Sequence, residues 1–123
     1  AKCVAGKGII GDRFFDYKPD YKGQITFFSH EVYEDLCLAF NLLNIPPSIF
    51  RRNVIVKDID LNELIGSEFE IQGIRFLGTV EATPCYWMNG AVAEGAEEAM
   101  KGRGGLRAKI LTSGTLRPEP TIV

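Results

Sequence analysis

The segment from Glu68 to Glu81 constrains the fold more than any other part of the sequence. Phe69 and Ile71 alternate with charged neighbours, which is the period-two pattern of a strand with one buried face. Gln72-Gly73 then supplies turn residues, and Ile74–Glu81 continues as a second strand. The segment therefore predicts a β-hairpin, which commits this part of the chain to antiparallel pairing.

Further segments have the β-branched and aromatic content of strands. They are Ala1–Val4, which resembles the tail of a strand, Gly23–Phe28, Arg51–Val56, and the pair Leu106–Leu111 and Thr115–Arg117, predicted to form a hairpin about Ser113-Gly114. Between the first two lies a glycine-rich loop, Gly6–Arg13, whose glycines permit backbone conformations that other residues resist. Strands joined by such short turns favour a curled, mostly antiparallel sheet.

Two longer segments predict helices. Ser29 can cap a helix that extends to about Asn44, with apolar residues at helical spacing, and it should stop before Pro46-Pro47. Ala91–Lys101 is rich in Ala and Glu and ends at Gly102. A third, shorter segment, Asp60–Gly66, predicts one capped helical turn ended by glycine.

The expected fold is therefore a β-rich α+β domain, with a mostly antiparallel barrel-like sheet and two helices packed on it. A chain of 123 residues is long enough for one hydrophobic core, so we expect residues 1–123 to form a single domain. Because the sequence begins at Ala1 in what resembles the end of a strand, we expect this domain to lack one or more N-terminal strands. No βαβαβ alternation supports a doubly wound nucleotide-binding fold.

Charge and hydropathy exclude several classes of partner. A formal net charge of −2 and a pI near 5.4 argue against general nucleic-acid binding, which requires a basic surface. No apolar run reaches the roughly 20 residues that cross a bilayer, and no signal-peptide pattern is present. The expected location is the cytoplasm, without a membrane partner.

Cys85 is the strongest candidate for chemistry. It follows the predicted strand Ile74–Glu81 and Pro84, where the chain leaves regular pairing and a side chain can be presented. As a thiolate, it could act as a nucleophile or a sulfur carrier. The alternative is that Cys85 is a small buried hydrophobic residue, as most free cysteines are. Cys37 lies within the first predicted helix, and we expect it in the core.

A glycine-rich basic segment, Lys101–Arg107, is the second candidate. Its exposed backbone N–H groups and its guanidinium groups could bind phosphate or carboxylate oxygens. The alternative is a plain turn, because glycine commonly marks turns. The sequence has one histidine, His30, and lacks metal-ligand spacing, C-x-x-C pairs and nucleotide-phosphate loops.

The order of these segments closely resembles the MOSC domain, named for the C-terminal domain of molybdenum-cofactor sulfurase. The resemblance is carried by GIIGDRF at 8–14, KGQITFF at 22–28, RRNVIV at 51–56, IDLNELIGSEFEIQGIRFLGT at 59–79, PCYWMN at 84–89 and KGRGGLRAKIL at 101–111.

This resemblance implies a barrel-like fold, a sulfur-carrying cysteine at Cys85 that could also ligate molybdenum, and a basic pocket for the anionic pterin of molybdenum cofactor. The residues that would bind the cofactor are Arg13, Arg51, Arg52, Asn53, Arg103, Gly104, Gly105 and Arg107. No pyridoxal-phosphate (PLP) site is encoded, so a separate PLP-dependent cysteine desulfurase would supply sulfur, and a molybdoenzyme or cofactor would accept it.

Three functions remain open from the sequence. The first is a cofactor-binding or sulfur-carrier domain with a sulfurtransferase-like activity. The second is a non-catalytic anion-binding or interaction domain in which Cys85 is buried and unreactive. The third is a component of a molybdenum-dependent reductase, in which the bound cofactor performs the redox step.

Overall fold

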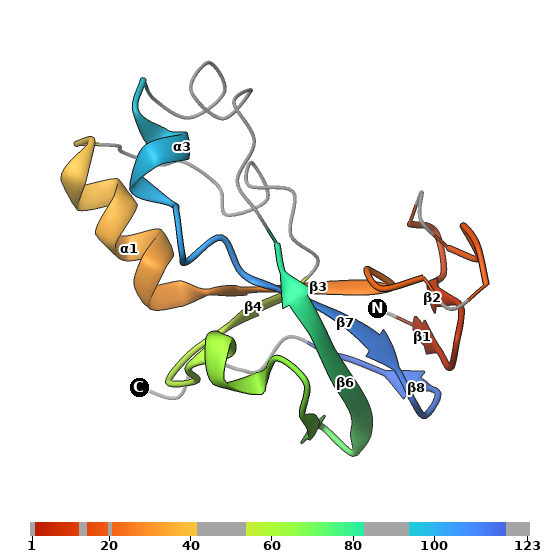
Figure 1. The fold of residues 1–123 in the computed structure, drawn as a ribbon. Helices are drawn as coiled ribbons and strands as arrows, with labels where there is room; N and C mark the ends of the chain where they lie inside the picture. The colour runs from red at the N-terminus through yellow and green to blue at the C-terminus, as the bar shows by residue number, and fades with distance from the viewer. Residues whose placement is uncertain (1, 13–14, 20, 42–53, 83–93, 118–123) are drawn as a thin grey trace.

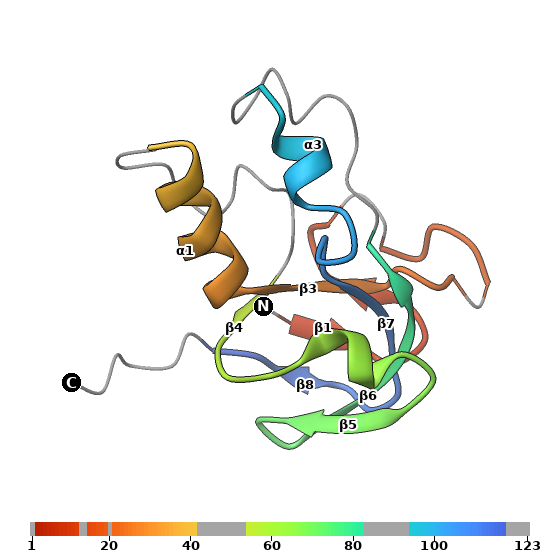
Figure 2. The same cartoon turned by 60° about the vertical axis from the view of Figure 1, so that its left-hand side comes forward.

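In the computed structural model, the described residues are 2–12, 15–19, 21–41, 54–82 and 94–117. They form a five-stranded sheet, with helices on one side and a three-stranded sheet toward the other (Figures 1 and 2). The elements are β1 (Lys2–Val4), β2 (Gly8–Ile9), β3 (Ile25–Ser29), α1 (His30–Ala39), β4 (Val54–Val56), the 3₁₀ helix η2 (Leu61–Leu64), β5 (Glu68–Ile71), β6 (Ile74–Glu81), α3 (Ala96–Ala99), β7 (Leu106–Ile110) and β8 (Gly114–Thr115). This is the expected β-rich α+β fold.

The large sheet has the strand order β4-β3-β7-β6-β5. All its neighbours are antiparallel except β3 and β4, which are parallel. The register aligns Val54, Phe27, Leu106 and Glu81 in one row across four strands. The residues that enter β7 and those that leave β6 therefore lie at the same end of the sheet.

The hairpin predicted over Glu68–Glu81 is confirmed. Ile71 pairs with Ile74, and Gln72 and Gly73 between them both have positive φ, 52° and 79°. This geometry matches a two-residue turn whose twist fits that of the strands. The Gln72 side chain also donates to the Arg117 carbonyl and accepts from its amide, both at 2.8 Å or less, which joins the turn to the end of the described chain.

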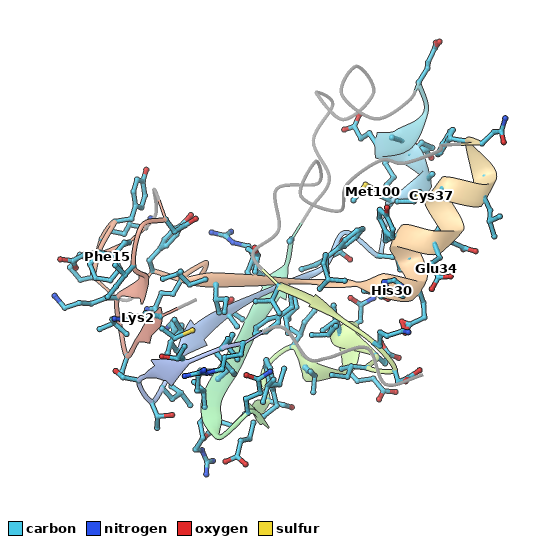
Figure 3. All side chains as sticks on the ribbon, turned by 180° about the vertical axis from the view of Figure 1, so that it is seen from behind. Lys2, Phe15, His30, Glu34, Cys37 and Met100 are labelled. Carbon is cyan, nitrogen blue, oxygen red and sulfur yellow. The ribbon has the colours of Figure 1, made fainter. Side chains whose placement is uncertain are left out.

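The two faces of the large sheet bury two apolar clusters. On one face, Phe27, Phe76 and Ile110 belong to the larger cluster, which also takes in Cys3 and Ile9 from the small sheet. On the other face, Phe28 packs with Leu36 of α1 and with residues of α3 and its end, including Met100 (Figure 3). Alternation along β3 thus directs successive phenylalanines to opposite layers.

The first predicted helix begins where expected but is shorter. The Ser29 hydroxyl accepts a hydrogen bond from the Val32 amide at 3.3 Å, which confirms the predicted cap of α1. The expectation that this helix reaches Asn44 is wrong, because α1 ends at Ala39 and Asn41 adopts a left-handed φ of 52°. Likewise, α3 is confined to Ala96–Ala99, within the predicted Ala91–Lys101.

The predicted hairpin between Leu106–Leu111 and Thr115–Arg117 is wrong. β8 pairs with β1 in the small sheet, with Lys2 opposite Thr115, and makes no ladder with β7. The Ala5 amide donates to the Ser113 hydroxyl at 2.9 Å, which fixes this turn against the N-terminal strand instead. The glycine-rich loop also differs from expectation, because its Gly8–Ile9 forms β2 beside β1. Among the described residues, no helix is long and apolar enough to span a membrane.

Candidate functional site

The structure describes four of the predicted site residues, namely Arg103, Gly104, Gly105 and Arg107. The predicted sulfur carrier Cys85, together with Arg13, Arg51, Arg52 and Asn53, lies outside the described residues. The described residues that border two of these segments make defined contacts. Val54, which follows Asn53, pairs with Phe27 of β3, and Ala82, which precedes the segment with Cys85, is bonded to Gly105.

The glycine-rich basic segment connects α3 to β7. Gly102 and Gly105 both have positive φ, 77° and 114°, which only glycine adopts readily. The Arg103 amide donates to the Met100 carbonyl, and the Gly105 carbonyl accepts from the Ala82 amide, each at 2.9 Å. The glycines therefore bend the chain from the helix layer into the sheet at the point where β6 ends.

The Arg103 side chain is held by groups of the protein itself. Its Nε donates to the Ala99 carbonyl at 2.8 Å, and its Nη1 pairs with the Asp35 carboxylate of α1 at 2.8 Å. The guanidinium therefore ties the end of α3 to α1 and has part of its charge neutralised. This engagement reduces its capacity to bind an external anion.

A pocket of about 190 Å³ opens beside Arg103. It is lined by Ser29, Val32, Ile59, Asp60, Leu61, Asn62, Arg103 and Gly105. Asn62 donates from Nδ2 to the Gly102 carbonyl at 2.7 Å, and the Ser29 hydroxyl caps α1. The sequence predicted only a capped helical turn over Asp60–Gly66. A cap pattern does not show that Asn62 contacts Gly102, 40 positions away.

Acidic groups surround this pocket. Asp60 lines it, Asp35 neutralises its arginine, and the Glu31 carboxylate lies 3.3 Å from the Ser29 hydroxyl. The Asp58 amide donates a hydrogen bond to the Glu31 carboxylate at 2.7 Å. This hydrogen bond is the main reason why the pKa of the Glu31 carboxyl is lower than its ordinary value. With one engaged cation and several carboxylates, the pocket is poorly suited to a ligand of high negative charge.

Arg107 has a different environment. Its guanidinium carbon lies 5.3 Å from the centre of the Tyr21 ring, and its side chain crosses the backbone of Gly23. Lys18 lies over the same ring at 5.5 Å. Sequence reasoning missed Tyr21 and Lys18, because neither forms a motif with the Arg-Gly segment. The structure thus directs the two predicted arginines of that segment into separate surroundings.

The described cysteines are poorer candidates than Cys85. Cys3 is 2% exposed in the main core, and this burial raises the pKa of its thiol. Cys37 is half-buried on α1 (Figure 3) rather than in the core as expected. Burial, and next the proximity of Cys37, raise the pKa of the Tyr33 phenol. His30 pairs with Glu34 one turn along α1, at 2.7 Å. Across the described ranges, no group of His, Cys, Asp and Glu could hold a metal ion.

We expect Arg103→Gln to lower the free energy of unfolding by about 1 kcal/mol, because it removes a partly exposed ion pair and a hydrogen bond to a helix carbonyl. Urea denaturation of Arg103→Gln, Asp35→Asn and the double variant measures this. The coupling energy between the two positions should be a few tenths of a kcal/mol to about 1 kcal/mol. If the free energy lost in the double variant equals the sum of the losses in the two single variants, the ion pair does not stabilise the fold.

The described residues form a small β-rich domain with a half-barrel sheet, and a basic, glycine-rich segment leads into its strand β7. The family model described as the MOSC domain matches residues 15–123, and the chain belongs to this family. A comparison with curated proteins found no match.

Solved structures show the same fold. The crystal structure of the YuaD protein from Bacillus subtilis is similar at a TM-score of 0.76 and 22% identity, covering 92% of this chain and 77% of that one. The crystal structure of a hypothetical protein is similar at a TM-score of 0.72 and 17% identity, covering 92% of this chain and 55% of that one. At these sequence identities, the two matches show a shared fold.

Proposed function

We propose that this domain binds molybdenum cofactor or carries activated sulfur on Cys85, with basic side chains near β7 holding an anionic group of the ligand. Membership of the MOSC family supports an association with this cofactor. The observation that carries the proposal is the hydrogen bond from the Ala82 amide to the Gly105 carbonyl, 2.9 Å long. It joins the end of the strand that leads to Cys85 to the glycine-rich basic segment.

Chain length limits how far Cys85 can be from that segment. Cys85 follows Ala82 by three residues, which span at most about 11 Å when fully extended. Arg107 follows Gly105 by two residues and lies on the neighbouring strand. A thiol and a cation within this range could serve one ligand, with sulfur chemistry at one end and an anion at the other.

The described residues fit the anionic part of such a cofactor. Arg107 provides guanidinium donors, and Lys18 adds positive charge beside the same aromatic ring. The proposal assigns any metal–thiolate bond to Cys85, since a soft thiolate suits this metal. When bound, the cofactor would supply the redox or sulfur-accepting centre.

In the sulfur-carrier role, the Cys85 thiolate attacks the outer sulfur of a persulfide on a donor protein. A new S–S bond forms at Cys85, and the donor thiolate leaves as the bond to its own sulfur breaks. We propose a PLP-dependent cysteine desulfurase as the donor and a molybdoenzyme or its cofactor as the acceptor. A nearby cation favours the thiolate that this step requires.

The test is mass spectrometry of each cysteine after incubation with a cysteine desulfurase and free cysteine, together with the pH dependence of alkylation. Cys85 should gain one sulfur atom and alkylate well below the free-thiol pKa of about 8.5. Cys3 should remain unmodified, because burial raises the pKa of its thiol and blocks access. Cys85→Ser should abolish sulfur loading, and Cys37→Ser should not.

An inert, unmodified Cys85 in the folded protein would exclude the carrier role. The domain would then be a binding module that recognises an anion without turnover, the second function that the sequence leaves open.

A further inference from the structure

The pocket beside η2 combines apolar walls with a few polar groups. Its described lining includes three apolar side chains, Val32, Ile59 and Leu61. Its volume of about 190 Å³ is smaller than the roughly 300 Å³ at which pockets for drug-sized ligands begin. A ligand that fits this pocket is therefore a small molecule with a short apolar part.

We propose that this pocket binds a small apolar α-amino acid as its zwitterion. Asp60 and Asn62 accept hydrogen bonds from the ammonium group of the ligand, and Arg103 donates to its carboxylate. This inference goes beyond the sulfur chemistry proposed for Cys85, because it rests on the pocket alone.

Two acceptor atoms are available at the start of η2. The Oδ1 atom of Asp60 accepts from the Asn62 amide at 3.2 Å, and the Nδ2 atom of Asn62 donates to the Gly102 carbonyl at 2.7 Å. Each side chain thus uses one polar atom to hold itself in place. Among the described residues, the Oδ2 atom of Asp60 and the Oδ1 atom of Asn62 have no hydrogen-bond partner. One charged and one neutral acceptor match an ammonium group, which has three donors and no acceptor.

Arg103 supplies the opposite charge. Its Nε donates to the Ala99 carbonyl and its Nη1 to Asp35, whereas its Nη2 has no partner in the part of the chain that the structure describes. These two contacts hold the guanidinium in position, with 36% of the side chain exposed. A carboxylate can accept from the remaining N–H groups. Because Asp35 offsets part of the charge, this arginine suits a carboxylate that brings its own cation better than it suits a lone anion.

The two kinds of group reach the pocket from different elements. The hydrogen bond between Asn62 and Gly102 joins η2 to the segment that leads into β7, so Asp60 and Arg103 line the same pocket. An α-amino acid carries its ammonium group and its carboxylate on one carbon atom, so one small ligand can contact both sides. A lone anion would face Asp60 and a lone cation would face Arg103, each with like charge. The zwitterion satisfies both.

The test uses L-valine and two controls that each lack one charged group. Isovalerate is L-valine without the ammonium group, and isobutylamine is L-valine without the carboxylate. Binding is measured by calorimetry, and NMR follows the side-chain amide signals of Asn62 and the Nε–H signal of Arg103. We expect L-valine to bind and to shift both sets of signals. Each control should bind about fivefold more weakly or worse, since it loses a charge-assisted hydrogen bond at a partly exposed site.

Asp60→Asn is the decisive variant, because asparagine caps a helix as well as aspartate and lacks the charge. It should weaken L-valine binding about fivefold and should not weaken isovalerate binding, since isovalerate has no ammonium group to lose a partner. Asp58→Asn is its matched control. It removes the same charge two positions away and outside the lining, at a left-handed φ of 59° that asparagine also adopts. Asp58→Asn should bind L-valine as the wild type does.

Arg103→Gln tests the other end of the ligand. In a protein that remains folded by circular dichroism, it should weaken L-valine binding and leave isobutylamine binding unchanged. Three results would each overturn the proposal: no binding of L-valine to the folded wild type, either control binding as tightly as L-valine, or Asp58→Asn weakening binding as much as Asp60→Asn.

Cys85→Ser separates this inference from the proposed function, and it should bind L-valine as the wild type does. If L-valine binds at Asp60 and Arg103 while Cys85 never accepts sulfur in the wild type, the amino-acid site stands and the carrier role fails. If Cys85 loads with sulfur and L-valine does not bind, the carrier role stands and this inference fails.

Discussion

Gly78→Ala should lower the free energy of unfolding by about 3 kcal/mol, near the upper end of the usual cost of overpacking. A Cβ atom at this position of β6 would lie 2.0 Å from the Leu64 carbonyl oxygen and 2.8 Å from its carbon. Both are backbone atoms, so no side-chain rotation relieves the clash. Urea denaturation followed by circular dichroism measures the loss as a lower midpoint with an unchanged slope.

The clash cannot relax easily, because β6 and the end of η2 are bonded together at this point. The Gly66 amide donates to the Gly78 carbonyl at 2.8 Å, and the Gly78 amide donates to the Ser67 carbonyl at 3.0 Å. To admit a methyl group, the chain must lengthen or break these bonds. The register shift between Gly78 and Val80 shows that the strand is already irregular there.

Gly23→Ala is the matched control, because the atoms nearest to its Cβ would be the end of the Arg107 side chain rather than backbone. We expect it to cost less than about 1 kcal/mol, the range of a substitution that a side chain can accommodate. If the two variants lost equal stability, the close approach of Gly78 to η2 would not be the cause of the effect.

Features encoded by a few neighbouring residues were predictable from the sequence. The Gln72-Gly73 turn, the Ser29 cap and the helical turn after Asp60 each depend on groups within three or four positions. Asp60, for example, caps η2 by accepting from the Asn62 amide at 3.2 Å. Such signals are local, so they persist whatever the rest of the chain does.

Pairings between distant segments were not predictable in the same way. The two residues of β8 carry too little pattern to choose a partner, and β1, more than a hundred positions away, takes them instead of β7. The end of α1 at Ala39 was not predictable from the apolar pattern either. Leu38 is 82% exposed, so the apolar pattern near the end of this helix is not matched by a surface that covers it.

The sequence located the basic segment but could not distinguish its arginines. Charge and spacing do not distinguish Arg103 from Arg107. In the structure, Arg103 pairs with Asp35 of α1, whereas Arg107 contacts Tyr21, which precedes β3. Asp35 and Arg103 are 68 positions apart, and nothing near either residue indicates the pair. The structure adds this difference: Arg103 is held by the Asp35 carboxylate, whereas Arg107 lies against the Tyr21 ring.

Phe76→Ala should cost about 4 kcal/mol, because it removes a fully buried ring from the centre of the main core. Phe76 contacts Phe27 edge-on at 5.2 Å between ring centres and stacks on Phe69 at 5.5 Å, so its loss also breaks two aromatic contacts. Phe69 is only half-buried, and Phe69→Ala should therefore cost clearly less in the same urea denaturation series. Phe76→Leu, which refills part of the cavity, should recover more than half of the loss. Equal losses for Phe69→Ala and Phe76→Ala would contradict the arrangement, since exposure would then not govern the contribution of either ring to stability.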